Sequence, residues 1–231
     1  MQSSLGYVLR TRPYSDTSVI VDVFTQDAGR FACMSRPAKL RGKVQRGHLQ
    51  AFRLLQMDWQ GRGELSRLMQ TDERFRHRVP GGHLLYGLYL NELILKLIQP
   101  HSNLDQLFTH YQHTVHGLTQ AEAPMSAVML FELSLLEALG HPINLWHDDV
   151  HGHEVVAGHS YHYSLGSGLL PSVESSQAVP GVPIQGELLV ALRTDEVLSL
   201  GQLQSLRRFL DRLWLRIVGK PFNSRKLLQL R

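Results

Sequence analysis

The sequence is poor in cysteine and lacks the long apolar runs that mark secreted and membrane proteins. Its 231 residues include one cysteine, so neither an internal disulfide nor a cysteine-rich zinc site can form. The first residues contain no apolar run typical of a signal peptide, and no segment reaches the roughly 20 apolar residues of a membrane helix. These absences predict a protein of the reducing cytoplasm with no membrane partner.

The sequence also lacks the common signatures of nucleotide binding and nucleophilic catalysis. It contains no GxGxxG after a strand, no GxxxxGK[ST] loop and no GxSxG elbow. The single thiol, Cys33, falls within a predicted strand, where we expect it to be buried and inert. The sequence therefore predicts no catalytic residues and no cofactor.

Charge is present in separate blocks. Residues 1–80 hold 14 Lys and Arg against 7 Asp and Glu, whereas residues 81–200 hold 2 against 12. Residues 201–231 are basic again, with 8 against 1. Basic ends of this kind predict a polyanionic partner.

The first 80 residues have the pattern of short strands. In SVIVDVF (18–24), Val19, Val21 and Val23 share one face of an extended chain. Four further candidates are residues 6–12, 30–35, 50–60 and 64–71. Five strands without an intervening helix favour a small closed barrel of the OB-fold type, although strand spacing alone also allows an SH3-like barrel or a short sandwich.

A basic stretch lies between the third and fourth predicted strands. Residues 37–47 contain two glycines and no acidic residue, which predicts a flexible basic loop rather than a helix. The candidate phosphate contacts in and before this loop are Arg30, Arg36, Lys39, Arg41, Lys43 and Arg46. The candidate base-stacking aromatics are Tyr14, Phe24, Phe31 and Trp59, at least half of which we expect in the core.

After residue 80 the apolar spacing becomes helical. Helices are predicted over 83–98, 104–118 and 125–139, followed by an irregular Gly-, Pro-, Ser- and His-rich segment, 141–186, with weak strand signals. The fold class is therefore α+β, with a barrel at 1–80 and a mainly helical part at 81–231.

A last amphipathic helix is predicted over 203–217, ended by Gly219, with Ser224 capping a short helix after it. The polar face of the longer helix carries Arg207, Arg208, Arg212 and Arg216. Together with Lys220, Arg225 and Lys226, this face either extends a DNA-binding surface or neutralises the acidic middle block.

Five of the 13 histidines are concentrated in one segment, at His147, His151, His153, His159 and His162. Neutral imidazoles at such spacings can converge on zinc or another divalent metal. The segment has no HExxH motif, so the simpler interpretation is a polar loop without metal, in which Asp148 and Asp149 form a solvated turn.

Several segments, in order along nearly the whole chain, resemble the RecO family. They are YVLRTRPYSDTSVIVDVFTQDAGR (7–30), LQAF (49–52), GRGEL (61–65), LYGLYLNELILKL (85–97), FELSLLEALGHPINL (131–145) and GKPFNSRKLL (219–228). No one motif is decisive, but their combination in this order is specific.

The resemblance implies an OB-fold followed by a helical domain, and a non-enzymatic recombination mediator acting at the nucleoid. Such a protein binds single- and double-stranded DNA and anneals strands coated with single-stranded-DNA-binding protein (SSB). With RecR it promotes loading of the RecA recombinase. It also implies that the basic loop from Arg36 to Arg46 contacts DNA, and that Asn91-Glu92 and Phe131-Glu132 serve helix packing.

The chain departs from the family pattern in two places. Some members carry a four-cysteine zinc module, but residues 145–180 here contain no cysteine, so the resemblance predicts no such zinc. Relatives often have arginine before the Phe-Glu pair, in a region that holds the acidic SSB tail. The residues proposed for the tail pocket here are Lys96, Met129, Leu130 and Arg216. The alternative functions are a metal-dependent nuclease or phosphodiesterase using the His147–His162 cluster, and a protein-binding scaffold.

Overall fold

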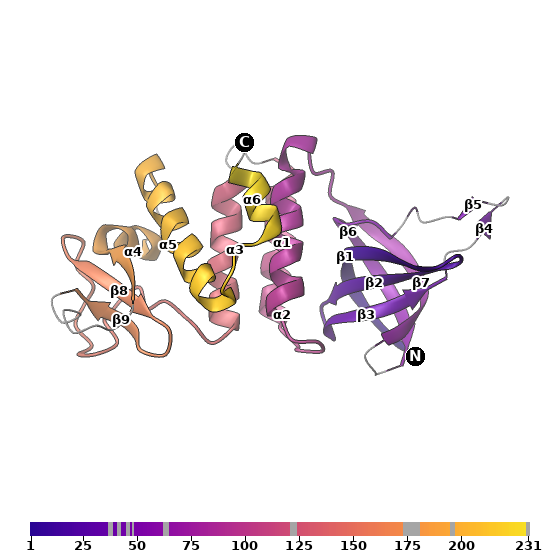
Figure 1. Cartoon of the computed structure of the whole chain (residues 1–231), viewed down its shortest axis with the longest axis horizontal. Coiled ribbons are helices and arrows are strands. Elements are labelled where there is room, and N and C mark those ends of the chain that lie inside the picture. The colour runs from indigo at the N-terminus through magenta and orange to yellow at the C-terminus, as the bar shows by residue number, and fades with distance from the viewer. Residues whose placement is uncertain are drawn as a thin grey trace. The chain divides into compact units, whose positions relative to one another are not determined.

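The structure is a computed structural model of the chain (Figure 1). It describes residues 1–36, 39–40, 43–44, 47, 49–61, 65–120, 124–172, 181–194 and 197–229. For residues 39–40, 43–44, 226 and 229 it describes the backbone. The chain divides into two compact units, Met1–Val128 with Phe222–Arg231, and Met129–Pro221, which are described separately. No helix of the described ranges is long and apolar enough to cross a membrane.

Five strands of the first unit form a closed barrel. They are β1 (Gln2–Ser15), β2 (Ser18–Thr25), β3 (Gly29–Ser35), β6 (Arg53–Gln60) and β7 (Leu65–Arg76), in the order β1-β2-β3-β7-β6. Neighbours pair antiparallel except β3 and β7, which are parallel. This closed order confirms the predicted OB-fold and excludes the sandwich alternative.

The barrel core follows from the alternation seen in the sequence. Val19, Val21 and Val23 are buried together with Phe31 and Trp59 inside the barrel. The other face of β2 is also covered, because Phe24 packs against the ring of Phe108, with the centroids 5.5 Å apart. Three of the four candidate stacking aromatics therefore belong to the core, as expected.

Part of the predicted basic loop is a hairpin. β4 (Lys39–Leu40) and β5 (Lys43–Val44) pair antiparallel, and Figure 1 shows them standing away from the barrel. The prediction of a loop was wrong for these four residues, because their backbones pair with each other as two short strands. Arg41 and Arg46 lie outside the described residues.

Helices α1 (Leu84–Leu97) and α2 (Asp105–Gly117) pack on the barrel, with the short helix η1 (Gly81–His83) leading into α1. Asn91 joins three elements: its Nδ2 donates to the Leu9 carbonyl (2.9 Å) and its Oδ1 accepts from the Tyr111 hydroxyl (2.7 Å). Gly87 lets α1 approach closely, since a Cβ there would lie 2.5 Å from the Phe52 ring. The structural role expected of Asn91 is thus confirmed.

Helix α6 (Asn223–Gln229) is held at its start by a residue of α1. The Glu92 carboxylate accepts from the backbone N–H groups of Asn223 (3.0 Å) and Ser224 (2.8 Å), and also from the Ser224 hydroxyl. The prediction that Ser224 caps this helix was wrong, because α6 already begins at Asn223 and the acceptor of the first N–H groups is the carboxylate of Glu92. Glu92 therefore has the packing role that the family resemblance implied.

The second unit contains a three-stranded sheet and helices. The sheet has the order β10-β8-β9, from β8 (Ser160–Ser164), β9 (Gly168–Pro171) and β10 (Val182–Gln185). Helix α3 (Pro124–Ala138) enters this unit from the first, and α4 (Gly186–Arg193), which was not predicted, follows β10. Helix α5 (Leu200–Val218) starts with a Ser199–Gln202 capping box and ends at Gly219, whose φ is 75°, as predicted.

Candidate nucleic-acid interface

Strand register brings several basic and aromatic residues to one end of the barrel. Pro13 of β1 pairs with Val19 of β2, and Val19 pairs with Ser35 at the end of β3. Arg12 and Tyr14, which flank Pro13, therefore lie at the same end as Arg36, which follows Ser35. The β4–β5 hairpin begins three residues after Arg36. We call Arg10, Arg12, Tyr14, Arg36 and this hairpin the basic rim.

Two arginines of the basic rim are oriented by one buried carboxylate. The Nε atoms of Arg10 and Arg12 lie 2.9 and 3.5 Å from Oδ2 of Asp22. Asp22 is buried, whereas the arginine side chains are about half exposed (51% and 47%). One carboxylate balances one guanidinium, so the group retains a net positive charge that faces solvent. Arg10 and Arg12 were not among the predicted contacts, although their period-two spacing was a signal that they share a strand face.

The predicted contacts in the barrel differ in their access to solvent. Arg36 is exposed at the end of β3. Arg30 is half-buried, and its Nε donates to the carbonyl of Ile98 at 2.9 Å, an arrangement that anchors it to the end of α1. Lys39 is the first residue of β4 and Lys43 is the first residue of β5, and the structure describes the backbone of both. Tyr14 is 60% exposed and is the remaining candidate for base stacking.

The C-terminal basic residues also differ in their exposure to solvent. Lys220 is exposed, Arg225 is buried, and Lys226 is described only by its backbone in α6. On α5, Arg208, Arg212 and Arg216 are exposed, whereas Arg207 pairs with Glu132 and Asp211. For Arg207, the structure supports the neutralising role rather than a surface role.

The four residues predicted to hold the SSB tail belong to different compact units. Lys96 pairs with Glu92 (2.6 Å) and lies over the ring of Phe222, 5.2 Å from its centroid. In the other unit, Met129 is buried, while Leu130 and Arg216 are exposed. A common site formed by these residues remains a prediction.

Among the five clustered histidines, the structure brings His151 and His153 together around Asp148. His159 lines the same pocket, whereas His162 forms a hydrogen bond with Ser172 (Nδ1 to Oγ, 3.1 Å). The prediction of a solvated turn was wrong for Asp148, which is only 3% exposed because it accepts backbone hydrogen bonds inside its own loop.

The single thiol is buried, as predicted. Cys33 is 1% exposed in the barrel core, and burial, together with the nearby Asp22 carboxylate, raises its pKa to about 12. A thiol with so high a pKa is neutral at physiological pH and is a poor nucleophile.

An OB-fold barrel with a basic rim, followed by helices and a small sheet, places the chain in the class of OB-fold proteins with an appended α-helical part. Comparison with known families agrees: the profile "Recombination protein O N terminal" matches residues 1–73, and "Recombination protein O C terminal" matches residues 81–226. The chain therefore belongs to the RecO family.

Individual relatives extend this agreement over almost the whole chain. DNA repair protein RecO of Azoarcus sp. is 35% identical over 97% of this chain and 93% of the relative. The next two relatives are each matched over 96% of this chain. DNA repair protein RecO of Aliivibrio salmonicida is 33% identical with 92% of it covered, and that of Psychromonas ingrahamii 31% identical with 95% covered. The chain is thus a RecO-family DNA repair protein.

Proposed function

We propose that this protein is a non-enzymatic mediator that binds single- and double-stranded DNA and anneals complementary strands. The observation that carries the proposal is the basic rim, where strand register puts Arg12, Tyr14 and Arg36 at the same end of an OB-fold barrel. Guanidinium groups neutralise phosphates without reading sequence, and an exposed aromatic ring offers a stacking surface to any base.

The proposed mechanism of annealing follows from charge. Two DNA strands repel each other through their phosphates, and a protein that binds both lowers this repulsion by releasing their counterions. Arg10 and Arg12 are held in place by Asp22 before DNA arrives, so less side-chain freedom is lost on binding. Base pairing then supplies the free energy, and the protein needs to break no covalent bond.

The partners that we propose for this protein are those expected of the RecO family. We propose that the protein acts in the cytoplasm at the nucleoid, engages the C-terminal tail of SSB, and works with RecR to load RecA. For the tail, Leu130 offers an exposed apolar surface and Arg216 a cation on the second unit. Lys96 would have to exchange its 2.6 Å pair with Glu92 for a carboxylate of the tail.

The test is annealing of complementary oligonucleotides, both naked and coated with the cognate SSB, at two salt concentrations. The rim variant is Arg36→Glu with Lys39→Glu. The control is Arg208→Glu with Arg212→Glu, which makes the same charge change on α5. We expect the rim variant to weaken binding to all sequences alike and to lower the salt slope by about 1.4 on single strands, if two phosphate contacts are lost. The control should retain most of the wild-type slope.

The outcomes separate the parts of this proposal. If the rim and control variants lose affinity equally, the rim is not the DNA-binding surface. If naked strands anneal but SSB-coated strands do not, the tail interaction is absent and DNA binding stands. If the protein accelerates neither reaction, the mediator function is wrong. Cleavage of the DNA that EDTA suppresses would contradict the non-enzymatic assignment.

A further inference from the structure

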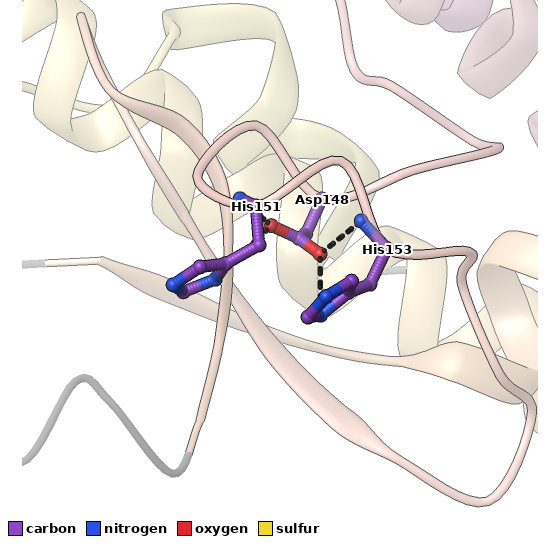
Figure 2. A group of neighbouring side chains, drawn as sticks. All are labelled: Asp148, His151 and His153. Atoms are coloured by element: carbon purple, nitrogen blue, oxygen red, sulfur yellow. Dashed lines mark hydrogen bonds and ion pairs between the residues drawn. The ribbon is translucent and has the colours of Figure 1, made fainter.

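The loop from Asp148 to His153 places a buried carboxylate between two imidazoles. Asp148 is 3% exposed, whereas the His151 and His153 side chains are 40% and 79% exposed. Figure 2 shows the two rings flanking the carboxylate, all three side chains coming from one loop. The side chains need no rearrangement of separate elements to meet.

The Asp148 carboxylate is held in one orientation by backbone hydrogen bonds within its own loop. Its Oδ1 accepts from the N–H groups of Val150 (3.0 Å) and His151 (2.6 Å), and its Oδ2 from that of His153 (2.8 Å). The two residues that carry the imidazoles thus also orient the carboxylate through their backbones.

The loop is anchored to the sheet next to it. Asp149 donates its N–H to the Leu169 carbonyl (2.8 Å) and accepts the Leu169 N–H at Oδ2 (2.6 Å). Gly168 is required beside it, since a Cβ there would lie 2.2 Å from Asp149 Oδ2. The loop is therefore preorganised by β9, which reduces the cost of ordering a ligand set.

The distances are close to those of a metal centre. The Nδ1 atoms of His151 and His153 lie 3.8 and 3.9 Å from the nearest Asp148 oxygens, and one ligand atom from each of the three residues fits within 4.8 Å. Ligand atoms about 2.1 Å from a tetrahedral zinc ion are about 3.4 Å apart. Closing the difference requires movement of the two imidazole rings, both of which are exposed.

We propose that Asp148, His151 and His153 bind one borderline divalent cation of the zinc class. Two imidazoles with a carboxylate favour such ions over Mg²⁺ and Ca²⁺, which prefer all-oxygen sites. The site opens into a pocket of about 590 Å³ that is also lined by His159, which leaves room for water or this histidine as a further ligand. The proposal goes beyond the proposed function in DNA repair, and it departs from the sequence-based expectation of no metal.

The experiment is a titration of the full chain, free of any affinity tag, with Zn²⁺ by calorimetry, and with Co²⁺ by visible absorption. The site variant is His151→Ala with His153→Ala, both exposed positions whose backbones continue to hold Asp148. The control, His110→Ala with His113→Ala, removes two exposed histidines of α2. We expect one Zn²⁺ per wild-type and control chain, and at least a tenfold loss of affinity in the site variant. Zn²⁺ should also raise the Tm of the wild type but not of the site variant.

Three results would overturn the proposal: no Zn²⁺ binding by the wild type, equal binding by the site variant, or loss of binding in the α2 control instead. Circular dichroism of the site variant without metal checks that it is folded. Because these readouts involve no DNA, failure of the metal site is distinguishable from failure of the proposed annealing function.

Discussion

Glu132 of α3 and Arg207 of α5 form a bidentate ion pair inside the second unit. Nη1 and Nη2 of Arg207 donate to the two carboxylate oxygens of Glu132 at 2.5 and 3.1 Å, and Nη2 also contacts Asp211 at 2.9 Å. Glu132 is completely buried, so the pair with Arg207 offsets part of the cost of burying its charge. The pair links the helix that carries the family's Phe-Glu motif to the arginine face of α5.

We expect Arg207→Ala to destabilise the protein by about 3 kcal/mol, because it removes a guanidinium that pairs with the buried Glu132 carboxylate. Urea unfolding followed by circular dichroism measures this change. The control is Arg208→Ala, the exposed neighbour on the same helix, which should change stability by about 0.5 kcal/mol or less. A similar small effect of both substitutions would show that the pair is not important for stability. Glu132→Leu combined with Arg207→Met should restore much of the loss.

Glu92 should make stability depend on acid pH. Burial raises the pKa of Glu92, but Lys96 and the donors of Ser224 and Asn223 outweigh it and lower the pKa to about 2. A carboxyl with a depressed pKa stabilises the fold above about pH 4.5, its ordinary value, and this contribution is lost as pH falls toward 2. We expect Glu92→Gln to cost about 1–2 kcal/mol at pH 7 and little at pH 2, measured by urea unfolding at several pH values. A constant difference between the two proteins across this range would contradict the pKa assignment.

His77 should make stability depend on pH in a higher range than Glu92 does. It is buried and shares a hydrogen bond with the Tyr7 hydroxyl (2.9 Å), and burial together with the nearby His116 lowers its pKa to about 4. Above about pH 6.5 both the folded and the unfolded states hold it neutral, so it makes no difference to stability there. Below pH 6.5 the unfolded state takes up a proton that the folded state refuses, so stability falls until about pH 4, by a total on the order of 2 kcal/mol.

The measurement for His77 compares thermal unfolding of the wild type and His77→Gln between pH 7 and pH 4. Glutamine keeps a polar partner for Tyr7 but does not titrate. We expect the stability of the wild type to fall more steeply than that of the variant as pH decreases. Parallel curves would mean that the pKa of His77 is not lowered in the folded state.

Most of the fold was predictable because it rests on local periodicity. The alternation of Val19, Val21 and Val23 specified a strand, and Gly219 marked the end of α5. The capping of α6 was not predictable in this way, since its acceptor, Glu92, is 132 residues from Ser224 in the chain. Sequence spacing carries no information about such distant partners until the fold brings them together.

In the candidate sites, too, local composition was predictable from the sequence, whereas the positions that depend on the fold were not. The basic character of residues 36–46 is visible in the sequence, but the position of Tyr14 at the same end of the barrel as Arg36 depends on the register of three strands. Asp148 was interpreted as solvated because acidic pairs in polar loops usually are. Its burial results from backbone N–H groups that turn back on it, a conformation that composition does not reveal.

Tyr14 should distinguish single-stranded from double-stranded DNA. Its ring is 60% exposed on the basic rim, and stacking of a base on an aromatic side chain contributes about 1–3 kcal/mol. Because bases in a duplex are already stacked on each other, we expect Tyr14→Ala to weaken binding to single strands about tenfold and to change duplex binding much less. Fluorescence anisotropy with labelled oligonucleotides measures both.

Two further variants show whether the ring itself is responsible. Tyr14→Phe should bind single strands nearly as well as the wild type, because the stacking face is retained. Trp146→Ala removes an exposed aromatic ring of the second unit that lies against Arg193, 4.8 Å from its guanidinium carbon, and should leave affinity unchanged. Equal losses on single and double strands in Tyr14→Ala would assign Tyr14 a role in positioning the rim rather than in stacking. Loss of binding in Trp146→Ala would place the single-strand contact on the second unit instead.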